Sequence, residues 1–207
     1  MIRSIVEEKG LYVIQGAQCP EIGLSNNSPA DVVISTENKT KLKPDEIKVI
    51  FEVKMSLVWN WQFKENEIIE FGDFKTHQGQ PGLLRSDSTL KAIGKCINIR
   101  VSDYQSAQIP LIVIGNTPIK KSYYSKVDHL KKAGIIQGFW SINPKPLNKE
   151  NTIKNTLEKG FIRFDSKNEL KINLNKLFDE ELNFFSSMKT TSQIGHFIEI
   201  ANMQENL

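Results

Sequence analysis

The chain has 207 residues, of which 39% are hydrophobic and 25% are charged, and its formal net charge is +3. This balance is typical of a soluble globular chain with one domain, or with one core and an appendage, and the length allows a sizeable core. The mild excess of 27 basic over 24 acidic residues is compatible with a nucleic-acid partner but does not by itself indicate one.

The motifs that the sequence lacks exclude several classes of enzyme. It contains no Walker loop, no G-x-G-x-x-G, no H-E-x-x-H and no G-x-S-x-G motif, and it has only three histidines. Cys19 and Cys96 are isolated, so they predict neither a disulfide framework nor a zinc site and fit a reducing cytoplasm. The N-terminal segment is acidic from Glu7, and no apolar run approaches the length of a membrane span. We therefore expect a cytoplasmic protein with no signal peptide and no membrane partner.

Apolar periodicity, helix-stopping glycines and polar breaks divide the chain into helices and strands. The predicted helices span residues 1–9, 86–100, 123–133 and 177–201. The predicted strands span residues 11–14, 28–35, 47–59, 109–115 and 135–142, and a small hairpin is predicted at residues 161–174. A crossover helix before the strand at 109–115 favours a parallel neighbour, so we predict an α/β fold with a central mixed sheet flanked by helices.

The strand predicted at residues 47–59 carries two charged side chains within an apolar run. Because side chains alternate across a strand, Glu52 and Lys54 share one face, while Phe51 and Val53 take the other. An unpaired charge in such a strand costs roughly several kcal/mol. We therefore expect a mutual ion pair, a bound metal, or both to compensate these charges.

The preceding strand brings a second carboxylate close to the first. A polar loop with a proline separates the two strands, which favours a hairpin. If Ser35 pairs with Ile47, Asp31 lies opposite Phe51, one step from Glu52. A slip of a residue or two in this register still places two carboxylates near one lysine.

Two carboxylates beside a lysine suit a hard divalent cation. Mg²⁺ takes few protein carboxylates, keeps several waters and leaves positions for phosphate oxygens. It would polarise a phosphate and lower the pKa of a bound water. Lys54 would hold the attacking water or neutralise the phosphate, since acting as a base would require its pKa to fall well below the free value of ~10.4. The alternative is that Asp31, Glu52 and Lys54 only neutralise one another.

The residues P-A-D at 29–31 and E-V-K at 52–54, within apolar strands, resemble the motif of the PD-(D/E)xK nuclease superfamily. The resemblance covers about residues 1–143. It implies a restriction-endonuclease-like core, in which a mixed sheet lies between helices, and Mg²⁺-dependent cleavage of phosphodiester bonds. The letters of the motif are degenerate, and the strand context on both sides makes the match more specific.

The resemblance assigns a role to each matching residue. Asp31 and Glu52 would bind Mg²⁺, the Val53 carbonyl would add a ligand, and Lys54 would orient the attacking water. In some nucleases of this type a glutamate of the first helix also reaches the metal, and Glu8 is the auxiliary candidate here. The alternative for Glu8 is a solvated surface charge.

Two segments after the catalytic strand contain candidates for DNA contact. The loop at residues 71–87 is rich in glycine and holds glutamine and arginine, which pair with base edges. In the helix at 86–100, Leu90 and Ile97 share one face, and lysines on another face suit phosphate contacts. Solvated surface is the alternative for both segments. The candidates are Lys75, His77, Gln78, Gln80, Arg85, Lys91 and Lys95.

These features together predict a Mg²⁺-dependent endonuclease that cuts double-stranded DNA at a specific site, most like a type II restriction endonuclease. Cutting both strands needs two sites, so a homodimer is expected. The alternatives are another nuclease of the same fold, such as a junction resolvase or a repair or transposition-associated enzyme, and a non-catalytic DNA-binding protein. The nuclease core is expected at residues 1–145. Residues 146–207 are expected to form a hairpin-plus-helix appendage that docks on the core or makes a dimer contact.

Overall fold

The computed structural model describes residues 2–55, 59–73, 82–142, 153–179, 182 and 191–205. In this part of the chain the α-helices are α1 (Arg3–Val6), α2 (Ser86–Ser102), α3 (Tyr124–Lys132), α4 (Lys167–Phe178) and α5 (Thr191–Glu205). The strands are β1 (Tyr12–Ala17), β2 (Ala30–Ser35), β3 (Ile47–Lys54), β4 (Trp59–Lys64), β5 (Glu67–Asp73), β6 (Leu111–Gly115), β7 (Gly138–Ile142) and β8 (Phe161–Phe164). None of the described helices is both long and apolar enough to cross a membrane.

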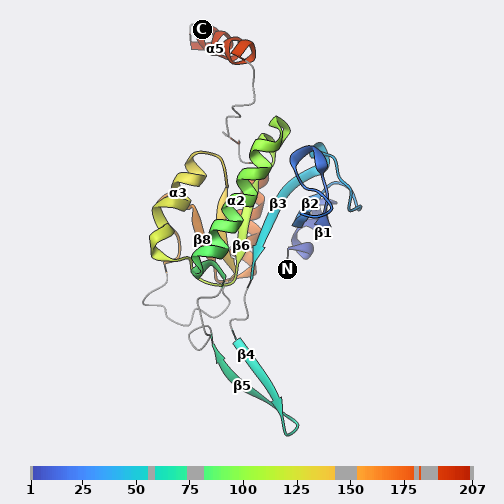
Figure 1. The fold of residues 1–207 in the computed structure, drawn as a ribbon, viewed down its shortest axis with the longest axis vertical. Helices are drawn as coiled ribbons and strands as arrows, with labels where there is room; N and C mark the ends of the chain where they lie inside the picture. Colours follow the sequence, from blue (N-terminus) through green and yellow to red (C-terminus); the bar gives the residue numbers. More distant parts are fainter. Residues whose placement is uncertain are drawn as a thin grey trace.

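Six strands form one mixed sheet in the order β1-β2-β3-β6-β7-β8, and β4 pairs with β5 in a separate ribbon (Figure 1). The first three strands are antiparallel neighbours, whereas β3, β6, β7 and β8 run parallel. α2 lies between β3 and β6 in the chain and is the crossover that this parallel pair requires. Every residue of β6 is buried, as in a strand covered on both faces. The predicted α/β fold with a mixed sheet flanked by helices is confirmed.

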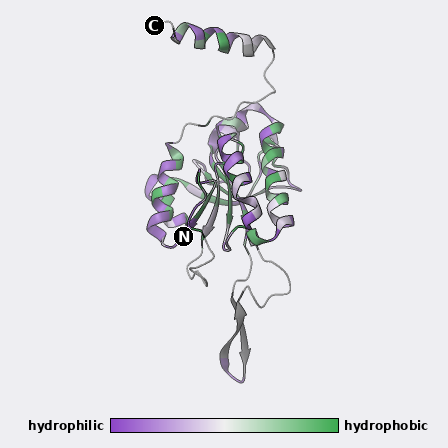
Figure 2. Cartoon of the chain, turned by 90° about the vertical axis from the view of Figure 1, so that its left-hand side faces the viewer, coloured by the Kyte–Doolittle hydropathy of each residue, from purple (hydrophilic) through white to green (hydrophobic). Residues whose placement is uncertain are grey.

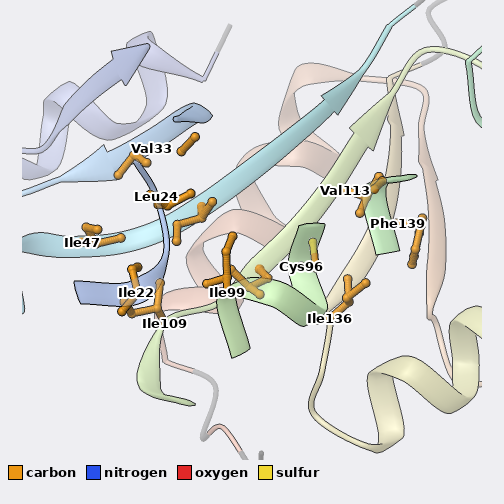
Figure 3. Packing of buried hydrophobic residues seen from close by; sticks show 14 of the residues in the cluster. Ile22, Leu24, Val33, Ile47, Cys96, Ile99, Ile109, Val113, Ile136 and Phe139 are labelled. Carbon is orange, nitrogen blue, oxygen red and sulfur yellow. The ribbon is translucent and has the colours of Figure 1, made fainter. Parts of the chain in front are cut away.

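Helices cover both faces of this sheet (Figure 2). On one face α2 and α3 pack against the sheet, and Cys96 and Ile99 of α2 point into the shared core (Figure 3). On the other face α1 and α4 pack against a second core. Because side chains alternate along β3, Ile50 belongs to the first core and Phe51 to the second. Glu52, two residues after Ile50, therefore points towards α2.

The hairpin of β2 and β3 is confirmed, but its register differs from the expected one at Asp31. Ser35 pairs with Ile47 as expected. A bulge next to Ser35 then shifts the pairing by one residue, so that Val32 rather than Asp31 lies opposite Phe51. A bulge has this effect because it places an extra residue in one strand, and every later pair moves with it. Asp31 thus lies one residue further along β3 than an unbroken pairing from Ser35 and Ile47 predicted.

The small hairpin predicted at residues 161–174 is wrong. Its first half is β8, which pairs parallel to β7 at the edge of the main sheet, and its second half belongs to α4. Ser166, taken for part of a turn, is the N-cap of α4, and its hydroxyl accepts the Glu169 N–H at 3.2 Å. Leu174 is buried while Ile172 is 45% exposed, which excludes a strand face that both would share. The edge strand and a covering helix therefore come from the segment expected to be an appendage.

Gly160, just before β8, allows the strand to approach the backbone of α3. A Cβ on Gly160 would lie 2.4 Å from the carbonyl carbon and oxygen of Val127 and 2.6 Å from the Asp128 nitrogen. The Gly160 N–H also donates to the Asp128 carboxylate at 2.8 Å. Since backbone must move to admit a methyl group, Gly160→Ala is expected to lower the free energy of unfolding by about 1–3 kcal/mol or more, measured by chemical denaturation.

A matched control for this substitution lies on α2. A Cβ at Gly94 would meet nothing within 4 Å, so Gly94→Ala is expected to raise stability by about 1 kcal/mol through helix propensity. If Gly160→Ala were as stable as the unsubstituted protein, the contact between α3 and β8 would not be tight.

Candidate active site

Glu52 and Lys54 lie at the end of β3, on the face that α2 covers. The Glu52 side chain is only 8% exposed, and its Oε1 accepts a hydrogen bond from the Lys54 ammonium group. The same ammonium donates to the Val53 carbonyl at 3.3 Å. The mutual ion pair expected from two charges inside an apolar strand is therefore present, and it offsets the cost of burying Glu52.

Asp31 joins this pair from the neighbouring strand. Its Oδ2 accepts, at 2.7 Å, the backbone N–H of Val53, the residue between Glu52 and Lys54. This hydrogen bond holds the carboxylate against β3. The Asp31 side chain is 37% exposed, so it borders solvent while Glu52 lies deeper. The two carboxylates therefore converge on the end of β3 despite the shifted register, and Lys54 contacts Glu52 directly.

A second lysine enters the site from α2. The Lys95 Nζ lies 2.7 Å from Glu52 Oε2 and 3.5 Å from Asp31 Oδ1, so one ammonium group contacts both carboxylates. Burial lowers the pKa of Lys95, but the hydrogen bond and charge of Glu52, together with Asp31, outweigh burial and raise it above its ordinary value. Lys95 is therefore charged, and the four side chains Asp31, Glu52, Lys54 and Lys95 form a charge-balanced group, here called the acid–lysine cluster.

Lys95 was predicted to share a DNA-facing surface with Lys91, and the structure separates the two. Lys91 is 73% exposed and pairs with Asp87 one turn earlier at 3.1 Å, whereas the Lys95 side chain is 22% exposed and turns inward. Lys91 remains available to a partner at the surface. Lys95 contacts the carboxylates instead.

The apolar face assigned to α2 from the sequence is the reason that the inward position of Lys95 was not predicted. Leu90 and Ile97 are 58% and 39% exposed, while Ala92, Cys96 and Ile99 are buried against the sheet. The face of α2 that packs on the sheet therefore carries Ala92, Cys96 and Ile99, and Leu90 and Ile97 lie outside it. The signal was present in the spacing, since a lysine at position 95 shares the face of residues 92, 96 and 99.

The cysteine beside the cluster is chemically inert near neutral pH. Burial raises the pKa of the Cys96 thiol to about 12, and the negative charge of Glu52 adds to the effect. Burial, with Glu21 nearby, raises the pKa of Cys19 to about 12 as well. Because the thiolate is the nucleophile and the metal ligand, neither cysteine supplies one.

Glu8, the auxiliary ligand suggested by the resemblance, does not lie near the cluster. Its carboxylate pairs with Lys171 of α4 at 2.6 Å. α1 and α4 pack on the face of the sheet opposite to α2, so the sheet separates Glu8 from Glu52. The Lys171 ammonium, through its hydrogen bond and its charge, lowers the pKa of Glu8. The structure supports the alternative of a surface charge, here in an ion pair.

Residues 74–81 of the loop predicted to read DNA bases lie outside the described residues, which include Arg85 but not Lys75, His77, Gln78 or Gln80. Arg85 is 63% exposed and lies 3.7 Å from Asp87. The end of the loop lies close to β3, because a Cβ at Gly82 would lie 3.2 Å from the Lys54 carbonyl oxygen. The next residue, Leu83, donates its N–H to Thr117 at 2.9 Å. This end of the loop therefore adjoins the acid–lysine cluster.

The donors in the cluster suit Mg²⁺ better than a metal that needs many protein ligands. The described residues contain no group of three or more histidine, cysteine, aspartate or glutamate side chains that could hold a metal. Asp31 and Glu52 offer two carboxylates, and the Val53 carbonyl follows Glu52 directly in the chain. A Mg²⁺ ion that keeps most of its waters needs no more protein oxygens than these. The residues present therefore fit the cation that the motif implies.

Comparison of the chain with models of known protein families, with curated proteins and with solved structures found no match.

Proposed function

We propose that this chain is a Mg²⁺-dependent DNA endonuclease of the PD-(D/E)xK type, with a restriction-endonuclease-like core, and most similar to a type II restriction enzyme. The observation that carries the proposal is the meeting of Asp31, Glu52 and Lys54 at the end of two paired strands, with Glu52 nearly buried. Charged groups gathered inside an apolar sheet are uncommon without a use in binding or chemistry.

The proposed mechanism assigns separate tasks to the three residues. Asp31 and Glu52 hold the cation, with the Val53 carbonyl as a further ligand. When bound, Mg²⁺ supplies a polarised phosphate, a bound water of lowered pKa and stabilisation of the added negative charge. Lys54, anchored by Glu52 and the Val53 carbonyl, orients the attacking water or neutralises the phosphate. The backbone N–H that binds Asp31 keeps that carboxylate in place.

The proposed partner is double-stranded DNA, and the proposed assembly is a homodimer with one site for each strand. Exposed basic residues near the cluster, such as Arg85 and Lys91, would contact DNA phosphates. Two buried free cysteines fit the reducing cytoplasm in which such an enzyme would work. A junction resolvase or a repair or transposition-associated nuclease would use the same cluster, and cleavage of branched DNA alone would favour a resolvase.

The second candidate function is a non-catalytic DNA-binding protein. The observation in its favour is that Lys54 and Lys95 together neutralise Asp31 and Glu52, so the cluster satisfies itself without a cation. In that case the four charges would serve only to join β2, β3 and α2. The two candidates differ in whether DNA is cut.

Incubating the protein with plasmid and genomic DNA in the presence of Mg²⁺ tests the proposal. We expect discrete fragments that disappear when EDTA removes the metal and when Lys54→Ala removes the ammonium next to the proposed metal ligands. Lys171→Ala, on α4 at the opposite face of the sheet, is the control and should keep the capacity to cut. Absence of cuts on all DNA, with Lys54→Ala binding DNA like the original chain, would favour the DNA-binding protein.

A further inference from the structure

One ammonium group occupies the position that a divalent cation bound to both carboxylates would need. The Lys95 Nζ is 2.7 Å from one oxygen of Glu52 and 3.5 Å from one oxygen of Asp31. The second oxygen of Glu52 is taken by Lys54, and the second oxygen of Asp31 accepts the Val53 N–H. The carboxylate oxygens left for a shared cation are therefore the two that Lys95 contacts.

The two lysines of the cluster differ in how they are held. Lys54 belongs to β3 and donates to the Val53 carbonyl as well as to Glu52, so both of its partners lie within its own strand. Lys95 reaches in from α2, and the described hydrogen bonds and ion pairs link its ammonium only to Glu52 and Asp31. Lys95 contacts Asp31, the more exposed of the two carboxylates. A lysine stem can carry its ammonium group outward to water.

We propose that Lys95 is an internal counter-ion that fills the metal position of the resting protein, and that a divalent cation enters only by displacing it. This inference rests on the proposed function, because it assumes that Asp31 and Glu52 bind metal. Once displaced, the ammonium lies next to the metal and is free to contact a DNA phosphate. Metal and Lys95 thus compete for the carboxylates, whereas DNA and the displaced lysine attract each other.

Two consequences distinguish this arrangement from a lysine that stays in place. Removing Lys95 should strengthen metal binding in the absence of DNA, because the cation no longer has to expel a resident charge. It should also reduce the gain in metal affinity that DNA produces, because by linkage a DNA that draws Lys95 away helps the metal to bind. If Lys95 instead stayed in place and supported the bound metal, its removal would weaken metal binding in the absence of DNA.

The test is to titrate Mn²⁺ into the original protein, Lys95→Met and Lys91→Met in the absence of DNA. Electron paramagnetic resonance measures how much Mn²⁺ is bound. We expect Lys95→Met to bind Mn²⁺ about tenfold more tightly or better, and Lys91→Met, whose lysine pairs with Asp87 at the surface, to match the original protein. The inference would be overturned if Lys95→Met bound Mn²⁺ as tightly as the original protein or more weakly, or if neither of these two proteins bound Mn²⁺.

Thermal unfolding gives a second readout and guards against a variant that folds poorly. In EDTA, Lys95→Met should melt at a lower temperature because two carboxylates lose a cation, and Mg²⁺ should raise its Tm by more than it raises that of the original protein. If Lys95→Met does not fold in EDTA, Lys95→Gln keeps hydrogen-bonding capacity without the charge and should show the same larger response to Mg²⁺. A smaller or equal response would contradict the inference.

Failure of this inference and failure of the proposed function give different results. If Lys95→Met binds Mn²⁺ more tightly but the original protein cuts no DNA, the counter-ion role stands and the nuclease proposal falls. If the original protein cuts DNA and Lys95→Met shows no gain in metal affinity, the nuclease proposal stands and the counter-ion role falls.

Discussion

Glu52→Gln is expected to reduce DNA cleavage by at least about a thousandfold while leaving DNA binding intact, since a bound metal is worth several kcal/mol of transition-state stabilisation. The amide keeps the volume of the side chain, so the packing of β3 against α2 is preserved. It removes the charge that Lys54 and Lys95 now neutralise and that we assign to the cation. The measurement is the rate of plasmid cleavage in Mg²⁺, with DNA binding followed by gel shift without metal.

The matched control for this variant is Glu46→Gln. Glu46 lies in the turn before β3, where it pairs with Lys39 at 2.6 Å, away from the acid–lysine cluster. The Glu46→Gln variant should cut DNA at the rate of the original protein. Circular dichroism would verify that both variants fold. Cleavage by Glu52→Gln at a rate near that of the original protein would reject Glu52 as a metal ligand and, with it, the proposed mechanism.

A chain that ends at residue 142 is expected not to fold, although the sequence alone placed the end of the nuclease core at 145. The shortened chain lacks β8 and α4, which cover β7 and the second core. Each large apolar side chain buried in these elements contributes about 1.5–3 kcal/mol. Their sum reaches the whole stability of a typical domain, about 5–15 kcal/mol. The residues concerned are Phe161, Phe164, Leu170, Leu174 and Leu177.

The contrast is a chain that ends at residue 179, which keeps β8 and α4 and lacks α5. The Phe197 and Ile198 side chains of α5 are 47% and 56% exposed, and α5 lies apart from the sheet in Figure 1. We expect this chain to unfold cooperatively at a Tm close to that of the full chain, measured by calorimetry. Cooperative unfolding of the chain that ends at 142, near the full-length Tm, would show that β8 and α4 are not needed by the core.

Much of the architecture was predictable from the sequence because it depends on local patterns. The continuous apolar run at 109–115 indicated a strand buried on both faces, and β6 is buried throughout. The helix predicted at 86–100 corresponds to α2, and β3 and β6, which precede and follow it in the main sheet, are parallel neighbours. The alternation along β3 placed Glu52 and Lys54 on one face, and the structure confirms their ion pair. Each of these features follows from periodicity within a short segment.

The predictions that failed depended on contacts between segments. The bulge beside Ser35 leaves no mark in the alternation of either strand, because it arises where two strands with unequal numbers of residues pair. The segment at 161–174 satisfies a hairpin pattern and a helix pattern equally well over a few residues. Its second half became α4 because Leu170, Leu174 and Leu177 bury on the second core at helical spacing.

By itself, then, the sequence determined that Asp31, Glu52 and Lys54 would meet, since they lie on adjacent strands joined by one loop and their spacing follows the strand period. The packing of the helices on the sheet, in contrast, places Lys95 in the group and Glu8 outside it. Lys95 arrives from a helix more than forty residues later in the chain, and its inward position depends on which face of α2, the one with Ala92, Cys96 and Ile99, packs against the sheet. Glu8 is kept away because α1 packs on the opposite face of the same sheet, a choice that no local pattern encodes.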